Sequence, residues 1–150
     1  IYVYDIPIYP YIHVFLSCIY SCRESVNVFL STSYVIDTLE TPEQVAVREC
    51  KEESGAIIDQ NDLELVCKYL VSSGGSNETL AIYCAPVDAS QVIGVHGLAT
   101  EGEDIQVCVL ERQALGQMLE QGKLTNAATI IAAQWLQQHY LRLQKQWSRV

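Results

Sequence analysis

The chain has 150 residues, 49% of them apolar, which is enough for one domain with a sizeable core and excludes a disordered chain. Its formal net charge is −9, because 18 acidic residues outnumber 9 Lys and Arg residues. A surface of that sign repels nucleic-acid backbones and anionic lipids, so neither is expected as a partner. It would also repel a phosphorylated small molecule unless bound cations reverse the charge locally.

The N-terminal part of the chain differs in composition from the rest. Residues 1–36 hold only three charged side chains but six of the nine tyrosines. Such a break predicts a boundary, and we place it between an unmatched apolar segment, residues 1–33, and a domain at residues 34–150. A membrane-spanning helix is not expected at residues 1–20, because two prolines, an aspartate and a histidine interrupt the apolar run.

A signal peptide is not expected either, since no basic residues precede the apolar run and the chain does not begin with Met. A fragment, or a stretch read in the wrong frame, is the alternative left open for this segment. Strands built from Ile, Tyr and Val are the structural alternative.

Residues 41–54 predict the first helix of the domain. Thr41 is a suitable N-cap, Pro42 suits the first helical position, and Gln44 completes a capping box. Gly55 follows as a C-terminal stop.

Three glutamates gather on one face of this helix. Glu49, Glu52 and Glu53 lie at i, i+3 and i+4, so their carboxylates converge. Like charges this close destabilise an isolated helix by a few tenths of a kcal/mol per pair. A divalent cation with oxygen ligands would offset that repulsion. Taken alone, the pattern is more typical of a solvated acidic face.

Strands and two further helices follow. Residues 63–71 and 79–87 predict strands joined by a polar loop at residues 72–77, and residues 105–110 alternate as a half-buried strand does. Helices are expected at residues 112–121 and 126–147. Five residues of the last helix share an apolar face: Ala128, Ile131, Ala132, Trp135 and Leu136. This order indicates a mixed α/β sandwich.

The six cysteines predict neither a zinc site nor a disulfide framework. Only Cys18 and Cys22 are close in sequence, and a single C-x3-C pair is a poor zinc signature. We expect all six as free thiols in a reducing cytosol, with Cys67, Cys84 and Cys108 as small core residues of strands.

The residues around the carboxylate helix form a longer pattern. In order, the pattern consists of Glu40, seven residues, Arg48-Glu49, an apolar Cys50, one residue, Glu52-Glu53, one residue, Gly55 and Ala56. This resembles the Nudix box, G-x5-E-x7-R-E-U-x-E-E-x-G-U with U apolar, except that Tyr34 replaces the opening glycine. The resemblance implies a loop-helix-loop in which Glu49, Glu52 and Glu53 bind Mg²⁺, or Mn²⁺ in its place.

In that family Glu40 and Arg48 would brace the motif, and Gly55 belongs to its structural frame. The resemblance also implies an α/β (α+β) fold, a Nudix-type α/β/α sandwich with a mixed sheet, incomplete at the N-terminus.

Three further segments resemble the ADP-ribose pyrophosphatases of this family. Residues 72–78 are similar to their S-P-G-G-x-x-E loop, with Ser73 in place of proline, and residues 94–105 to G-x-H-G-L-A-D-E-N-E-D-I; residues 126–136 match their C-terminal helix. The resemblance implies hydrolysis of ADP-ribose to AMP and ribose 5-phosphate. It makes Glu101 the general base and Glu103 an additional metal ligand.

It also places Ser73, Gly74, Gly75 and Glu78 at the substrate pocket. Without the resemblance, residues 101–104 would be an ordinary acidic surface loop, and His96 is assigned no chemistry.

The family implies a cytoplasmic homodimer acting on a nucleoside diphosphate sugar, without nucleic-acid or membrane partners. Three alternatives remain: an enzyme for another such sugar, for example GDP-mannose; a catalytically inactive fragment or nucleotide-binding module; and a membrane-tethered interaction protein, which rests on residues 1–20 alone.

Overall fold

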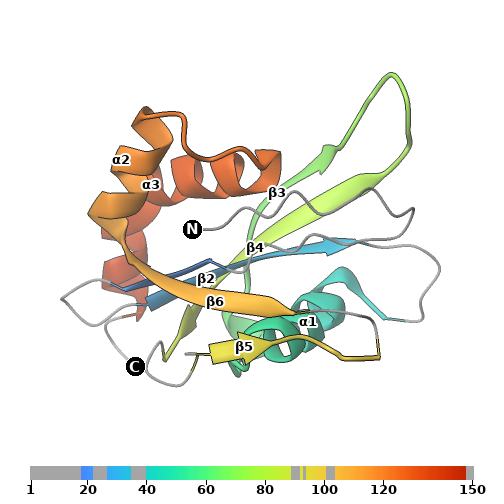
Figure 1. The fold of residues 1–150 in the computed structure, drawn as a ribbon, viewed down its shortest axis with the longest axis horizontal. Helices are drawn as coiled ribbons and strands as arrows, with labels where there is room; N and C mark the ends of the chain where they lie inside the picture. Colours follow the sequence, from blue (N-terminus) through green and yellow to red (C-terminus); the bar gives the residue numbers. More distant parts are fainter. Residues whose placement is uncertain are drawn as a thin grey trace.

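The computed structural model describes residues 18–21, 27–34, 40–88, 92, 94–100 and 104–147, with the backbone alone for the first two ranges (Figure 1). No helix in these ranges has the length and apolar character needed to cross a bilayer. The apolar run at residues 1–20 lies almost wholly outside the described residues.

One mixed sheet organises the described residues. Its strands are β1 (Cys18–Ser21), β2 (Asn27–Tyr34), β3 (Glu64–Leu70), β4 (Thr79–Val87), β5 (Gly94–His96) and β6 (Ile105–Glu111). They lie in the order β3-β4-β2-β1-β6-β5. The β1–β6 pair is parallel and the other pairs are antiparallel. The predicted mixed sheet is therefore confirmed.

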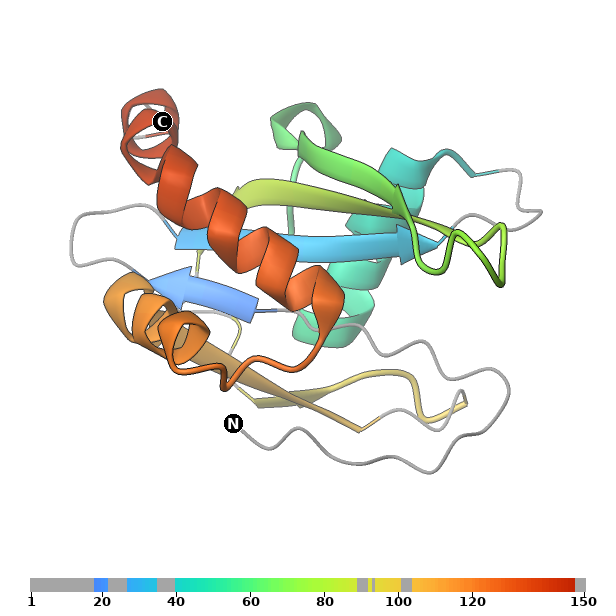
Figure 2. The same cartoon turned by 90° about the horizontal axis from the view of Figure 1, so that it is seen from above.

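Three helices cover the two faces of this sheet. They are α1 (Pro42–Ser54), α2 (Arg112–Glu120) and α3 (Ala127–Trp147), and a short 3₁₀ turn, η1 (Gln60–Asp62), follows α1. Figures 1 and 2 show α1 on one side of the sheet and the α2–α3 pair on the other. The predicted α/β/α arrangement is confirmed.

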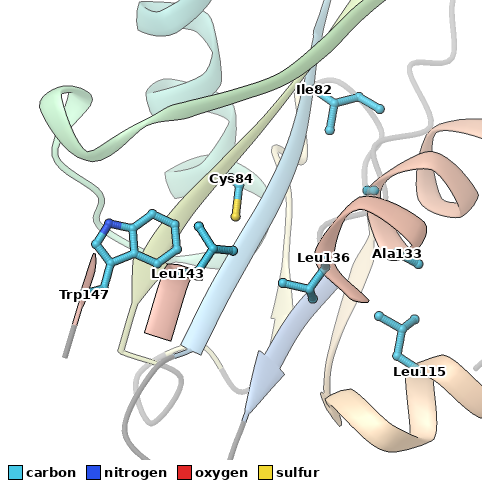
Figure 3. Packing of buried hydrophobic residues seen from close by; sticks show 8 residues of the cluster. Ile82, Cys84, Leu115, Ala133, Leu136, Leu143 and Trp147 are labelled. Atoms are coloured by element: carbon cyan, nitrogen blue, oxygen red, sulfur yellow. The ribbon is translucent and has the colours of Figure 1, made fainter. Parts of the chain in front are cut away.

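The larger core lies between the sheet and the α2–α3 pair. Alternate residues of β4, Ile82 and Cys84, face α3 there, as the two-residue period of a strand requires. Figure 3 shows them packed with side chains of both helices: Leu115, Ala133, Leu136, Leu143 and Trp147. The face expected for the last helix is confirmed, since Ala132 and Leu136 are buried and the other three residues pack against the cluster.

The opposite face of β4 packs against α1. Ala46 of the helix meets Ala81 and Tyr83 of the strand, and Cys50 clusters with Ala85. Small side chains on both partners allow a helix to lie close to a sheet. This is how α1, which carries the glutamates, is held against the rest of the protein.

The predicted boundaries of all six elements agree with the structure to within one residue at each end. Four elements lie outside those six: the 3₁₀ turn and β5, and β1 and β2, for which strands were only an alternative. The strands β1 and β2 come from the stretch that composition sets apart, and they take the centre of the sheet. Because β2 ends at Tyr34, it crosses the boundary expected between residues 33 and 34, which stays a prediction from composition.

The cysteine prediction is partly confirmed. Cys50, Cys67, Cys84 and Cys108, the four whose side chains the structure describes, are free thiols. Cys84 is buried, but Cys108 lies on β6 and is exposed, so its expected place in the core is wrong. Strand alternation turns Cys108 outward while Val107 beside it is buried.

Candidate functional site

Helix α1 is fixed at both ends by the residues that predicted it. At the start, the Thr41 hydroxyl accepts a hydrogen bond from the Gln44 amide at 3.3 Å, and the Gln44 side chain accepts one from the Thr41 amide at 2.8 Å. At the end, Gly55 adopts φ 72° and its N–H donates to the Lys51 carbonyl at 2.9 Å. The reciprocal capping box and the glycine stop are both confirmed.

Arg48 draws three carboxylates together on the exposed side of α1. Its Nη1 lies 2.8 Å from both Glu49 Oε1 and Glu52 Oε2. Its Nε lies 3.4 Å from Glu40 Oε2, on the segment that precedes the helix. Since Glu49 and Glu52 share one guanidinium nitrogen, their carboxylates face the same point. The spacing predicts that Glu53 joins them, but the contacts at Arg48 include only Glu49 and Glu52 of the three.

The charges of these partners outweigh burial at Arg48. Partial burial acts to lower the pKa of the guanidinium, but the carboxylates of Glu49 and Glu52 raise it further, with a net upward shift. Arg48 therefore stays fully charged, and it links Glu40 to the helix as a brace would.

Glu53 occupies a different environment, with only 1% of its surface exposed. A carboxylate buried to this extent requires compensation by hydrogen bonds or by a cation. Burial raises the pKa of the neighbouring Cys50 thiol to about 12. A hydrogen bond with Ser54 opposes this rise, and the charge of Glu53 adds to it. Cys50 is therefore a protonated packing residue.

The donor atoms of α1 suit a hard divalent cation, since Glu49, Glu52 and Glu53 all offer carboxylate oxygens. Within the described ranges, no group of three or more His, Cys, Asp or Glu side chains is arranged to hold a metal ion. Glu101 and Glu103, the predicted base and additional ligand, lie outside the described residues.

The predicted substrate loop lies at the tip of the β3–β4 hairpin. Ser73, Gly74 and Gly75 are exposed there, and Glu78 is partly exposed. The hydrogen bonds described for this loop stay within the hairpin, for example from the Gly75 amide to the Ser72 carbonyl at 3.0 Å. Figure 1 shows the tip clear of α1, so the structure does not bring these residues to the carboxylates.

Comparison with known proteins links the matched residues to one group of enzymes. No family model matches the chain. The ADP-ribose pyrophosphatases of Escherichia coli (strain K12) and Shigella flexneri are each 43% identical to it over 114 residues, which are 76% of this chain and 54% of theirs. The ADP-ribose pyrophosphatase of Haemophilus influenzae is 39% identical over 115 residues, 77% of this chain and 52% of its own.

Over those residues, the chain is similar to these ADP-ribose pyrophosphatases. The N-terminal region lies outside the match. The chain spans about half the length of the curated relatives it matches.

Two contacts of α1 were not predicted from the sequence. The Tyr83 hydroxyl, on β4, donates to Glu43 Oε1 in the first turn at 2.7 Å. The Gly97 amide, after β5, donates to the Glu52 carbonyl in the last turn at 3.0 Å. Both join residues at least forty positions apart, so no local pattern signals them. The only hint was the G-x-H-G pattern at residues 94–97, which the resemblance had included without a role.

Proposed function

We propose that this chain carries a Mg²⁺-dependent site that hydrolyses the pyrophosphate of ADP-ribose to AMP and ribose 5-phosphate. The observation that carries the proposal is the 43% identity to proteins named ADP-ribose pyrophosphatase over three-quarters of the chain. The residues of α1 support it, because Glu49, Glu52 and the buried Glu53 supply carboxylate oxygens from one helix.

In this proposal Glu49, Glu52, Glu53 and Glu103 hold Mg²⁺, or Mn²⁺ in its place. When bound, the cation neutralises the charge of the diphosphate and lowers the pKa of water. Glu40 and Arg48 brace the helix, and Gly55 ends it. The net charge of the chain is −9, so its acidic surface repels an anionic substrate. A bound cation would reverse the charge locally and let the substrate approach.

The remaining roles fall to residues of two loops. Glu101 accepts a proton from the attacking water, whose oxygen forms a bond to phosphorus while the bond from phosphorus to the bridging oxygen breaks and that oxygen leaves with the other phosphate. The resemblance also assigns Ser73, Gly74, Gly75 and Glu78 to the substrate pocket, at the tip of the β3–β4 hairpin and away from the carboxylates of α1. The substrate is a small nucleoside diphosphate sugar, and a cytoplasmic homodimer is the form proposed for the protein.

A charge-removing substitution at the most buried carboxylate tests the proposal. Glu53→Gln keeps the shape of the side chain but removes a cation ligand, so AMP release from ADP-ribose in the presence of MgCl₂ should fall about a hundredfold or more. Release of AMP is followed by chromatography, and circular dichroism checks that the variant folds. Glu120→Gln, at the exposed end of α2, is the matched control and should leave the rate unchanged.

The same assay tests two alternatives. The first is a protein that binds a nucleotide without turning it over. Folded, cation-loaded protein that releases no AMP would establish such an inactive fragment. Faster turnover of GDP-mannose than of ADP-ribose would instead assign the site to a different nucleoside diphosphate sugar.

A further inference from the structure

The C-terminal end of α1 is closed from two directions. The last carbonyls of a helix have no partner within it and must be satisfied from elsewhere. Gly55 supplies one amide locally, to the Lys51 carbonyl, and Gly97 supplies another from beyond β5, to the Glu52 carbonyl at 3.0 Å. The turn that carries Glu52 and Glu53 is therefore tied to a segment distant in the sequence.

The imidazole of His96 lies against the same turn. A methyl group built on Gly55 would lie 2.7 Å from Cε1 and 3.1 Å from Nδ1 of His96, closer than packed atoms allow. The ring therefore fills the space that a side chain at residue 55 would need. Two reasons therefore require glycine at position 55: its backbone φ is 72°, and the His96 ring leaves no room for a side chain.

The position of the ring is set by the sheet. His96 ends β5 and pairs with Ile105 of β6, so its backbone is fixed by the β5–β6 ladder. Its Nε2 is buried and has no hydrogen-bond partner among the residues that the structure describes. The described contacts of the ring are thus packing contacts, and they act on the end of α1.

We propose that His96 is a positioning residue for the cation-binding carboxylates. Its ring and the Gly97 amide hold the last turn of α1 in place, and this turn sets where Glu52 and Glu53 point. The inference rests on the proposed function, in which these carboxylates bind a divalent cation. Groups that orient metal ligands typically change metal affinity by about 10- to 100-fold when they are removed.

The first arm of the test needs no metal. His96→Ala removes the ring, and hydrogen exchange followed by NMR should then show the amides of Gly55 and Gly97 exchanging about tenfold faster or more, while core amides of β4 keep their protection. Val95→Ala is the matched control, because Val95 lies on the same strand with 60% of its surface exposed. It should leave all these amides unchanged.

The second arm measures cation binding directly. Titration of the full chain with MnCl₂, followed by electron paramagnetic resonance, should show Mn²⁺ binding weakened about tenfold or more by His96→Ala. Val95→Ala should bind Mn²⁺ as the unmodified chain does. His96→Gln retains part of the ring's volume, so its affinity should fall between those of the alanine variant and the unmodified chain.

The outcomes separate this inference from the proposed function. Mn²⁺ affinity in His96→Ala within twofold of the unmodified chain overturns the positioning role, as does a uniform loss of protection throughout the sheet. Failure of both His96 variants to fold would make His96 a core residue and would also overturn it. An unmodified chain that binds Mn²⁺ but releases no AMP contradicts the proposed function alone.

Discussion

Tyr83 and Glu43 show how a single side chain joins the sheet to the helix of the candidate site. The Tyr83 ring is buried in the layer between β4 and α1, with 2% of its surface exposed, and its hydroxyl reaches Glu43 at 2.7 Å. This hydrogen bond is the main reason why the pKa of Glu43 is lowered. Burial, followed by the bond to Glu43, raises the pKa of Tyr83, so its hydroxyl remains the donor.

Tyr83→Phe removes only this hydroxyl, and we expect the free energy of unfolding at pH 7 to fall by about 1 kcal/mol. The folded pKa of Glu43 lies below its ordinary value of 4.5, so the associated stability is present above that pH. It is lost as the pH falls through the lowered folded pKa. The difference between the two proteins should therefore shrink in urea melts below about pH 4.

Tyr69→Phe is the control for this measurement. Tyr69 is partly buried on β3, and the structure describes no side-chain hydrogen bond for it. The variant should stay within about 0.5 kcal/mol of the unmodified chain at every pH. A Tyr83→Phe deficit that does not change with pH would contradict the assigned role of Glu43.

At the scale of the element, α1 depends on its caps. Its Ala46 and Cys50 face the sheet, while its outer face carries Arg48 and like-charged glutamates, which add little to helix stability. The first turn is therefore held by the capping box at Thr41 and Gln44. The cap matters to the site as well, because it fixes where the helix begins relative to Glu40.

Thr41→Ala should lower the free energy of unfolding by about 1 kcal/mol, since it leaves the Gln44 amide without its acceptor. Chemical denaturation measures the change. The same substitution at Thr125, which is exposed and outside any helix, should cost less than about 0.5 kcal/mol. Equal losses at both positions would show that the capping box does not stabilise α1.

At the scale of the whole molecule, β4 is the wall between two cores. Alternate residues of β4 pack against α3 on one face and against α1 on the other. A change in the packing of one core can therefore shift the other core through this strand. Leu136 lies at the centre of the α3-side core with 1% of its surface exposed. The α1 side consists mostly of alanine, cysteine and valine, which bury less apolar area per residue.

Leu136→Ala should therefore lower the free energy of unfolding by about 2–5 kcal/mol, because it leaves a cavity among residues that cannot close it fully. Leu141→Ala provides the matched control on the same helix, since 70% of Leu141 is exposed. Its effect should stay within about 0.5 kcal/mol. Thermal melts of the two variants measure these changes. Similar losses of unfolding free energy in both variants would show that Leu136 does not lie in the main core.

The sequence by itself determined the features that depend on neighbours a few positions away. The caps of α1 join residues 41 and 44, and 51 and 55, and the predicted approach of Glu49 to Glu52 spans a single turn. Strand boundaries followed from β-rich runs, from the polar loop between two of them and, at residues 105–110, from apolar alternation, for the same reason. Glu101 and Glu103 stay predictions that rest on resemblance alone.

Only the tertiary structure decided which distant residues meet. The Tyr83 bond to Glu43, the His96 ring on Gly55, the outward turn of Cys108 and the central place of β1 and β2 all depend on strand pairing. β5 is three residues long beside glycines, and its pairing with β6 rather than its own propensity makes it a strand. Such contacts are fixed by the packing of the whole chain, which no local pattern encodes.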